Sequence, residues 1–189
     1  MSPADEVGPT VDSPRAIETE RLRLRAIAPD DIELLVELDS DPEVMRYLNG
    51  GKPRSRAEVE DMLKRALGHF WMAFDRTTED FVGWFGLRPT AEHDRELGYR
   101  MRRAAWGKGL ATEGSMALIA TAFTELGTQR VWAQTMTVNT RSRAVMERCG
   151  LRYVRTFFGE WGPPIEGSEL GDVEYELTKH DWERSLVSR

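Results

Sequence analysis

The sequence predicts an α/β (α+β) fold in which one mixed sheet carries helices on both faces. The first observation is length, because 189 residues suit one domain around a single core. The second is that segments with a strand pattern alternate along the chain with segments that have a helical stripe. The third is residues 111–126, which are apolar on most sides and therefore belong against a sheet rather than at the surface.

The individual elements follow from local patterns. Residues 21–27 alternate polar and apolar, which is typical of a strand with one exposed face. One helix follows the acidic pair Asp30 and Asp31, and another begins at Ser55, where Glu58 completes a capping box. The predicted helices are residues 32–38, 55–67, 111–126 and 142–149. The predicted strands are residues 21–27, 70–74, 81–87, 97–101, 131–136, 153–158 and 172–177.

Composition excludes several classes of protein. The single cysteine, Cys149, excludes an internal disulfide framework and leaves no spacing for zinc, which favours a reducing compartment, the cytoplasm. A formal net charge of −6 argues against a nucleic-acid partner and suits a cationic acceptor. No segment approaches the roughly 20 apolar residues of a membrane span, so no membrane partner is expected. Residues 1–15 are proline-rich and lack a signal-peptide pattern, which predicts a flexible leader before one domain, residues 16–189.

A glycine loop, defined here as residues 106–112, follows a predicted strand and opens the apolar helix. At such a place, unpaired backbone N–H groups and the positive end of the helix dipole converge on one spot, which suits an anion. Gly107 and Gly109 would let phosphate oxygens approach the backbone and would allow a turn with positive φ. A plain strand-to-helix turn has the same local pattern, so the loop alone leaves both interpretations open.

Two known phosphate-binding loops fit this segment poorly. A P-loop needs Ser or Thr after its Gly-Lys pair, whereas Lys108 is followed by Gly109. A dinucleotide-binding loop would place a glycine at Thr112 and an acidic residue near the end of the next strand, where Gln134 and Thr135 stand. Neither loop therefore explains the segment, and a plain turn and a third kind of phosphate site both stay open.

Three segments together carry a resemblance to a known family. They are the opening at residues 17–25, the glycine loop with its continuation to residue 113, and residues 139–151. They resemble the GNAT superfamily of acyl-CoA N-acyltransferases, in particular the subfamily of ribosomal-protein alanine N-acetyltransferases and spermidine acetyltransferases. The superfamily's Gln or Arg, three residues before the first loop glycine, is replaced by Ala104.

The resemblance implies the GNAT fold, a mostly antiparallel sheet of about seven strands that splays at the acetyl-CoA site. Acetyl-CoA is then the co-substrate, with its pyrophosphate on the loop amides and its pantetheine arm paired along residues 101–103. Asn139 would bind the arm, and Lys108, Arg141 or Arg143 would meet the adenosine phosphates. The cofactor residues so implied are Met101, Arg102, Arg103, Trp106, Gly107, Lys108, Gly109, Leu110, Ala111, Thr112, Asn139, Ser142 and Arg143.

Acetyl transfer needs a neutral amine, a donor for the oxyanion and a proton for the leaving thiolate. Glu96 precedes the glycine loop where the superfamily often places the general base, although a surface glutamate is the alternative. Many members use a tyrosine as proton donor where this sequence has Met146. Ser142 is therefore the candidate donor, with helix capping as its alternative. The implied oxyanion donor is a backbone N–H near Met101.

Candidate acceptor residues come from two places. Residues 158–172 are too long for a tight hairpin and mix acidic with aromatic residues. Within them, Glu160 and Trp161 are predicted to bind an ammonium group by charge and cation–π contact, with a solvated crossover as the alternative. Trp84, in the predicted hairpin, is a candidate pocket wall.

The sequence thus predicts an N-acetyltransferase that passes the acetyl group directly to a primary amine in a ternary complex. The leading acceptor is a protein N-terminal α-amine, as the resemblance to the ribosomal-protein enzymes implies. With a pKa of about 7.7 to 8.0, such an amine demands less of a base than a lysine-like amine near 10.4, so a weak or distant base would suit it. A polyamine or aminoglycoside, a non-catalytic acyl-CoA-binding module and a nucleotide-dependent oxidoreductase are the alternatives. No metal is expected, and a homodimer is left open.

Overall fold

The computed structural model describes residues 16–159 and 164–187. The predicted leader, residues 1–15, and the predicted acceptor residues Glu160 and Trp161 lie outside the described residues. What was expected of them therefore stays a prediction.

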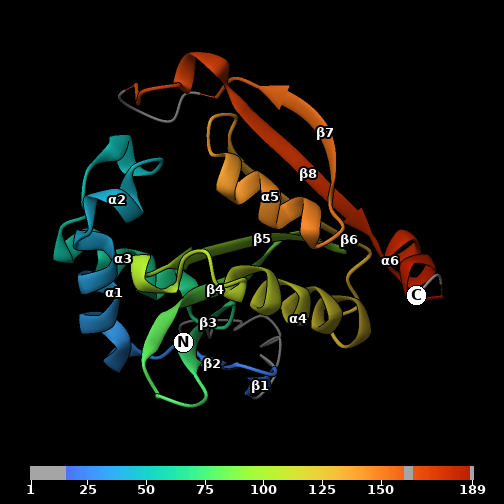
Figure 1. The fold of residues 1–189 in the computed structure, drawn as a ribbon, viewed down its shortest axis with the longest axis horizontal. Coiled ribbons are helices and arrows are strands. Elements are labelled where there is room, and N and C mark those ends of the chain that lie inside the picture. The colour runs from blue at the N-terminus through green and yellow to red at the C-terminus, as the bar shows by residue number, and fades with distance from the viewer. Residues whose placement is uncertain (1–15, 160–163, 188–189) are drawn as a thin grey trace, which may run out of the picture.

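An eight-stranded sheet in the order β1-β2-β3-β4-β5-β6-β8-β7 forms the centre of the protein (Figure 1). Neighbouring strands pair antiparallel except β5 and β6, which are parallel, and this confirms a mixed, mostly antiparallel sheet. The sequence indicated about seven strands because β1 is too short to show a pattern. The strands are β1 Ile17–Glu18, β2 Leu22–Ala26, β3 Phe70–Asp75, β4 Phe81–Ala91, β5 Asp94–Met101, β6 Arg130–Met136, β7 Arg152–Phe157 and β8 Asp172–Thr178.

The helices begin and end largely where the sequence indicated. The capping box at α3 is confirmed, because the Glu58 N–H donates to Ser55 Oγ and the Ser55 N–H donates to the Glu58 carboxylate. Two helices were not predicted: α2 is a single turn that starts at Pro42, and no residue of α6 is buried. The helices are α1 Ile32–Ser40, α2 Pro42–Met45, α3 Arg56–Ala66, α4 Leu110–Thr124, α5 Thr140–Arg148 and α6 Lys179–Val187, with 3-10 turns at Pro29–Asp31, Asn49–Gly51, Arg103–Ala105 and Ser168–Leu170.

Helices cover both faces of the sheet, as predicted (Figure 1). On one face, Leu35 of α1 and Val59 of α3 pack with Met72 of β3. On the other face, Leu118 of α4 and Met146 of α5 belong to the larger core cluster. The side chains of β4 divide between the two clusters, because successive side chains of a strand point to opposite faces, whereas the apolar side chains of β5 belong to the larger cluster.

The parallel pair β5 and β6 separates along its length. Their pairing runs only from Asp94 with Arg130 to Glu96 with Trp132. Beyond these pairs β5 continues to Met101, whereas β6 pairs onward with β8 on its other side. We call the diverging ends of the two strands, residues 97–101 and 133–136, the splay. It confirms the splay that the family resemblance implied.

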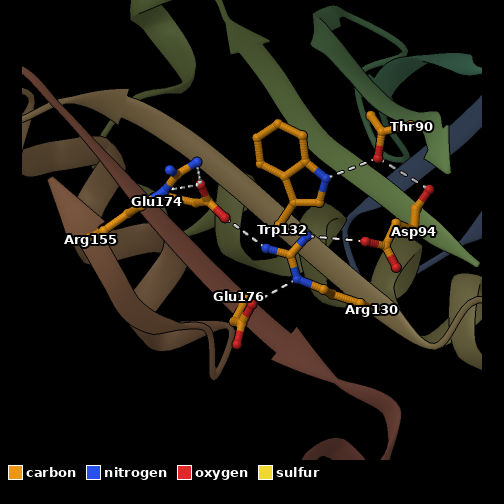
Figure 2. A network of polar contacts seen from close by, with 7 residues as sticks. All are labelled: Thr90, Asp94, Arg130, Trp132, Arg155, Glu174 and Glu176. Carbon is orange, nitrogen blue, oxygen red and sulfur yellow. Dashed lines mark hydrogen bonds and ion pairs between the residues drawn. The ribbon is translucent and has the colours of Figure 1, made fainter. Parts of the chain in front are cut away.

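A network of charged side chains holds the strands together where β5 and β6 still pair (Figure 2). Arg130 on β6 contacts three carboxylates: Asp94 at 3.1 Å, Glu174 at 2.7 Å and Glu176 at 2.7 Å. Glu174 also accepts from Arg155 of β7 at 2.7 Å. The network therefore joins β5, β6, β7 and β8, so that the splay opens from a fixed end.

Candidate functional site

The glycine loop has a backbone conformation that only glycine adopts readily. Gly107 and Gly109 have φ angles of 73° and 78°. A Cβ on Gly107 would meet no atom within 4 Å, so the space in front of this residue is open. Gly109 is the N-cap of α4, and Leu110, Ala111 and Thr112 form the first turn, where backbone N–H groups lack helical partners. This geometry suits a phosphate group at the start of α4.

The opening segment of the chain holds the glycine loop in place. Glu113, in the first turn of α4, accepts from Thr19 Oγ1 at 2.6 Å, from the Arg21 N–H at 2.8 Å and from Arg21 Nε at 2.7 Å. Arg21 Nη1 also donates to the Lys108 carbonyl at 2.8 Å. Two of the three family motifs are thus parts of one structure. In the sequence they are two separate motifs, because the contacts of Glu113 with Arg21 and Thr19 join residues 92 and 94 positions apart.

These contacts change the acidity of Glu113. Burial raises the pKa of the carboxyl group, but hydrogen bonds from Thr19 and Arg21 and the charge of Arg21 outweigh it. The pKa of Glu113 is therefore lowered from its ordinary value. The ion pair stays formed at neutral pH.

The backbone of Met101 faces the splay. The Arg102 N–H donates to the Val82 carbonyl of β4 at 2.9 Å. Because successive backbone groups of a strand point to opposite edges, the N–H and C=O of Met101 point away from β4. The Met101 carbonyl accepts from Trp106 Nε1 at 2.9 Å. The Met101 N–H thus lies on the edge where the predicted oxyanion donor is needed.

The start of α5 provides a hydroxyl group beside the splay. Asn139 is the N-cap of this helix, because its Oδ1 accepts from the Ser142 N–H at 3.2 Å. Helix capping, the alternative role for Ser142, is therefore wrong. The Ser142 Oγ instead lies 3.0 Å from the hydroxyl of Tyr99 on β5. Asn139 Nδ2 donates to Thr135 Oγ1 at 3.0 Å.

Tyr99 was not identified from the sequence. Tyr99 lies on the same face of β5 as Leu97 and Met101, which is the face toward the larger core cluster. Its contact with α5 depends on how the chain folds and has no local pattern. The pKa of Tyr99 is raised to about 12, because the effect of burial is larger than the opposing effect of the hydrogen bond with Ser142.

The basic residues predicted to meet phosphates take different positions. The Arg141 guanidinium lies 5.2 Å from the centroid of the Trp106 ring, which brings the second motif against the glycine loop. Arg143 donates instead to the Tyr175 hydroxyl at 3.2 Å and to the Thr137 carbonyl at 3.1 Å. Arg141 is therefore better placed than Arg143 to meet a phosphate at the loop.

Arg102 and Arg103 point toward the corner between α1 and α2. Arg102 pairs with Glu37, and Arg103 Nε lies 2.6 Å from an Asp41 carboxylate oxygen. Their side chains are thus engaged with carboxylates, and the expected pairing of their backbone with the pantetheine arm stays a prediction. Together with their partners they line a cavity of about 230 Å³ formed by Glu37, Leu38, Asp41, Val44, Arg102, Arg103 and Ala104.

Glu96 is the last residue of β5 that pairs with β6, so it lies where the splay begins. Its Oε2 accepts from Arg88 Nε at 3.1 Å, and its Oε1 accepts from Gln134 Nε2 at 3.3 Å. Both carboxylate oxygens therefore already have partners. The sequence indicated this residue but none of its partners, because they lie on neighbouring strands.

Trp84 is packed inside the cluster between the sheet and α1 and α3. Its ring stacks on Phe70 with centroids 4.6 Å apart, and the Arg100 guanidinium lies 5.2 Å from its centroid. Arg100 in turn pairs with the buried Asp39 of α1. With 7% of its surface exposed, Trp84 is mainly a core residue, and its role as a pocket wall stays a prediction.

Comparison with known proteins decides the family. The family model of the acetyltransferase (GNAT) domain matches residues 21–152. The chain belongs to the GNAT family. This GNAT protein is 34% identical over 196 residues to the FsC-acetyl coenzyme A-N(2)-transacetylase of Aspergillus fumigatus, with 93% of the chain and 81% of the relative covered.

Solved structures share the fold of this GNAT protein. RimL, a ribosomal L7/L12 alpha-N-protein acetyltransferase in complex with coenzyme A, matches with a TM-score of 0.74 and 16% identity over 87% of this chain and 98% of that one. Spermidine N-acetyltransferase from Vibrio cholerae, in complex with coenzyme A and spermine, matches with a TM-score of 0.73 and 16% identity over 87% and 99%. At this identity the likeness shows the fold alone.

The GNAT protein is an acetyl-CoA-dependent N-acetyltransferase, and acetyl-CoA is its co-substrate. The thioester supplies an activated acetyl group. The open space at Gly107 and the amides at the start of α4 fit its pyrophosphate. Among the described residues, no group of three or more His, Cys, Asp or Glu side chains is placed to hold a metal ion. None of the described helices is long and apolar enough to cross a membrane.

Proposed function

We propose that the enzyme acetylates a primary α-amine, which attacks acetyl-CoA directly in a ternary complex. The observation that carries the proposal is that both oxygens of Glu96, the candidate base, are held by Arg88 and Gln134. A carboxylate whose two oxygens are already engaged must give up a partner before it can accept a proton from an amine. It suits an α-amine, with a pKa of about 7.7 to 8.0, better than a lysine-like amine near 10.4.

The other groups take the roles that the site's geometry supports. The amides of the glycine loop hold the pyrophosphate, and the Met101 N–H donates to the oxyanion that develops as the amine attacks. Ser142 donates to the leaving sulfur, since Met146 has no proton to give. Arg141, beside the Trp106 ring, meets an adenosine phosphate.

Two carriers of the α-amine are proposed. A protein N-terminus is supported by the shared fold with RimL, which is named as an alpha-N-protein acetyltransferase. An amine of another type of molecule is supported by the A. fumigatus relative, which is named for transfer to an N(2) nitrogen. A polyamine is less favoured, because its amines are too basic for a held carboxylate.

A panel of amines tests the proposal. Peptides with a free N-terminus, amino-acid amides, spermidine and an aminoglycoside are incubated with acetyl-CoA, and the release of free thiol is followed. We expect kcat/KM for the best α-amine to exceed that for spermidine at neutral pH by at least about tenfold, since far more of an α-amine is neutral. Preference for spermidine or the aminoglycoside would overturn the α-amine assignment, and no turnover of any amine would overturn the proposed function.

A further inference from the structure

Tyr99, on the β5 side of the splay, and Ser142, on α5, form a pair of hydroxyl groups. The Tyr99 hydroxyl lies 3.0 Å from Ser142 Oγ and 3.5 Å from the Ser142 carbonyl oxygen. One partner belongs to β5 and the other to the first turn of α5. The pair thus joins the two elements between which the acetyl-CoA arm is expected to lie.

The Ser142 hydroxyl is not used to cap α5, so it can donate a hydrogen bond to a ligand. Asn139 caps α5 through its own side chain and uses the Ser142 backbone N–H, not the hydroxyl. Met146, at the position where the family resemblance implies a tyrosine in many members, is 3% exposed and packs in the main core. Ser142 therefore supplies a side-chain donor at this end of α5, and its direction depends on Tyr99.

We propose that Tyr99 is a positioning residue. Its hydroxyl donates a hydrogen bond to Ser142 Oγ, and this directs the Ser142 hydroxyl proton at the sulfur of coenzyme A. A serine hydroxyl has one proton and two lone pairs. Once Tyr99 occupies one lone pair, the serine proton is free for a third group. The 3.0 Å contact to Oγ is favoured over the 3.5 Å contact to the carbonyl, which is at the limit for a hydrogen bond.

This role of Tyr99 rests on the proposed function, the direct transfer of the acetyl group to an amine. The amine nitrogen forms a bond to the acetyl carbon, and the carbon–sulfur bond breaks with its electron pair going to sulfur. The sulfur leaves as a thiolate that accepts the Ser142 hydrogen bond, and the proton lost by nitrogen passes to solvent water. Burial keeps Tyr99 protonated as an O–H donor throughout, because it raises the pKa of this phenol to about 12.

Free coenzyme A provides a test that needs no acceptor. The thiol of the bound coenzyme is titrated by its ultraviolet thiolate absorbance, with the complex of desulfo-coenzyme A, which lacks the sulfur, as the blank. Losing a hydrogen bond to a charged sulfur moves the midpoint of the thiol titration about one pH unit higher. We expect this for Tyr99→Phe, at least as large a shift for Ser142→Ala, and no further shift in the double variant.

Matched controls separate positioning from packing. Tyr153→Phe removes another tyrosine hydroxyl, which pairs with Thr156 Oγ1 at 2.9 Å on β7, and should leave the titration unchanged. Desulfo-coenzyme A should bind wild type and Tyr99→Phe equally well. With the best acceptor, Tyr99→Phe should lower kcat roughly tenfold and leave the KM for acetyl-CoA unchanged.

The outcomes separate this inference from the proposed function. If wild type does not bind coenzyme A, both are overturned. If coenzyme A binds and the midpoint is the same in wild type and Tyr99→Phe, the proposed function stands and the role of Tyr99 is overturned. Additive shifts from Tyr99→Phe and Ser142→Ala would likewise show that Tyr99 does not act through Ser142.

Discussion

The glycine loop and the acceptor side of the splay differ in how their working groups are held. The loop presents backbone amides whose conformation depends on Gly107 and Gly109 and on one contact set at Glu113. On the acceptor side, both carboxylate oxygens of Glu96 are engaged with other side chains, those of Arg88 and Gln134. The cofactor side is therefore preformed by backbone that Thr19 and Arg21 hold in place, whereas the acceptor side consists of side-chain pairs that a ligand can exchange. Substitutions should affect the two sides very differently.

The largest effect is expected at Gly107. A valine there would occupy the open space in front of the loop and weaken coenzyme A binding by roughly 100-fold or more, about 3 kcal/mol. Calorimetric titration with coenzyme A measures this loss. Gly127→Val is the matched control, because Gly127 has a φ of 64° and equally open space but follows α4. Equal affinities for the two variants would place the pyrophosphate elsewhere.

The charged network that joins β5, β6, β7 and β8 comes next. Arg130→Met removes the cation that three of its carboxylates share. It leaves Glu174, which is 7% exposed, with Arg155 alone. We expect a loss of about 3 kcal/mol in the free energy of unfolding, measured in urea. Arg65→Met, which removes an exposed pair with Asp61, should cost less than about 1 kcal/mol. Similar losses would mean that the network does not hold the splay.

Glu113→Gln tests how the loop is held. It should lower the free energy of unfolding at pH 7 by about 2 kcal/mol, because the Gln cannot accept charge-assisted bonds from Thr19 and Arg21. The pKa of Glu113 is lowered in the folded protein, so its contribution is present above the unfolded pKa and is lost as pH falls through the lower folded pKa.

The difference between wild type and Glu113→Gln should therefore be full at neutral pH and shrink in acid. Urea unfolding at both conditions measures it. Glu125→Gln, at an exposed position after α4, is the control and should change little at either pH. A difference that persists unchanged in acid would show that the carboxylate charge is not what holds the loop.

The smallest effect is expected at Glu96. Because its oxygens are already held, Glu96→Gln should lower kcat for an α-amine by less than about tenfold, below the usual contribution of a general base. The pH profile of kcat/KM should keep the slope set by the amine itself. A loss of several hundredfold would show that the carboxylate leaves Arg88 and acts as the base.

Local signals predicted much of the fold and the cofactor side. The capping box at Ser55 and the glycine loop are contiguous, so their geometry follows from adjacent residues. The contact between Tyr99 and Ser142 spans 43 positions, and that between Thr19 and Glu113 spans 94. Such pairs have no periodicity to detect.

The sequence also could not predict which carboxylates the exposed basic side chains pair with. Arg102 and Arg103 lie next to the glycine loop in the chain, yet they pair with Glu37 and Asp41, which belong to the α1–α2 corner. Long charged side chains follow the nearest opposite charge in space, and that is set by helix packing. The same reason left the partners of Glu96 unpredicted.

The most direct test of a preformed coenzyme A site is calorimetric titration of the wild-type chain with acetyl-CoA and, in parallel, with NAD. Binding of acetyl-CoA with a Kd in the micromolar range or tighter, about −8 kcal/mol, and no measurable binding of NAD, is the result that this site predicts. Absence of acetyl-CoA binding, or tighter binding of NAD, would contradict it.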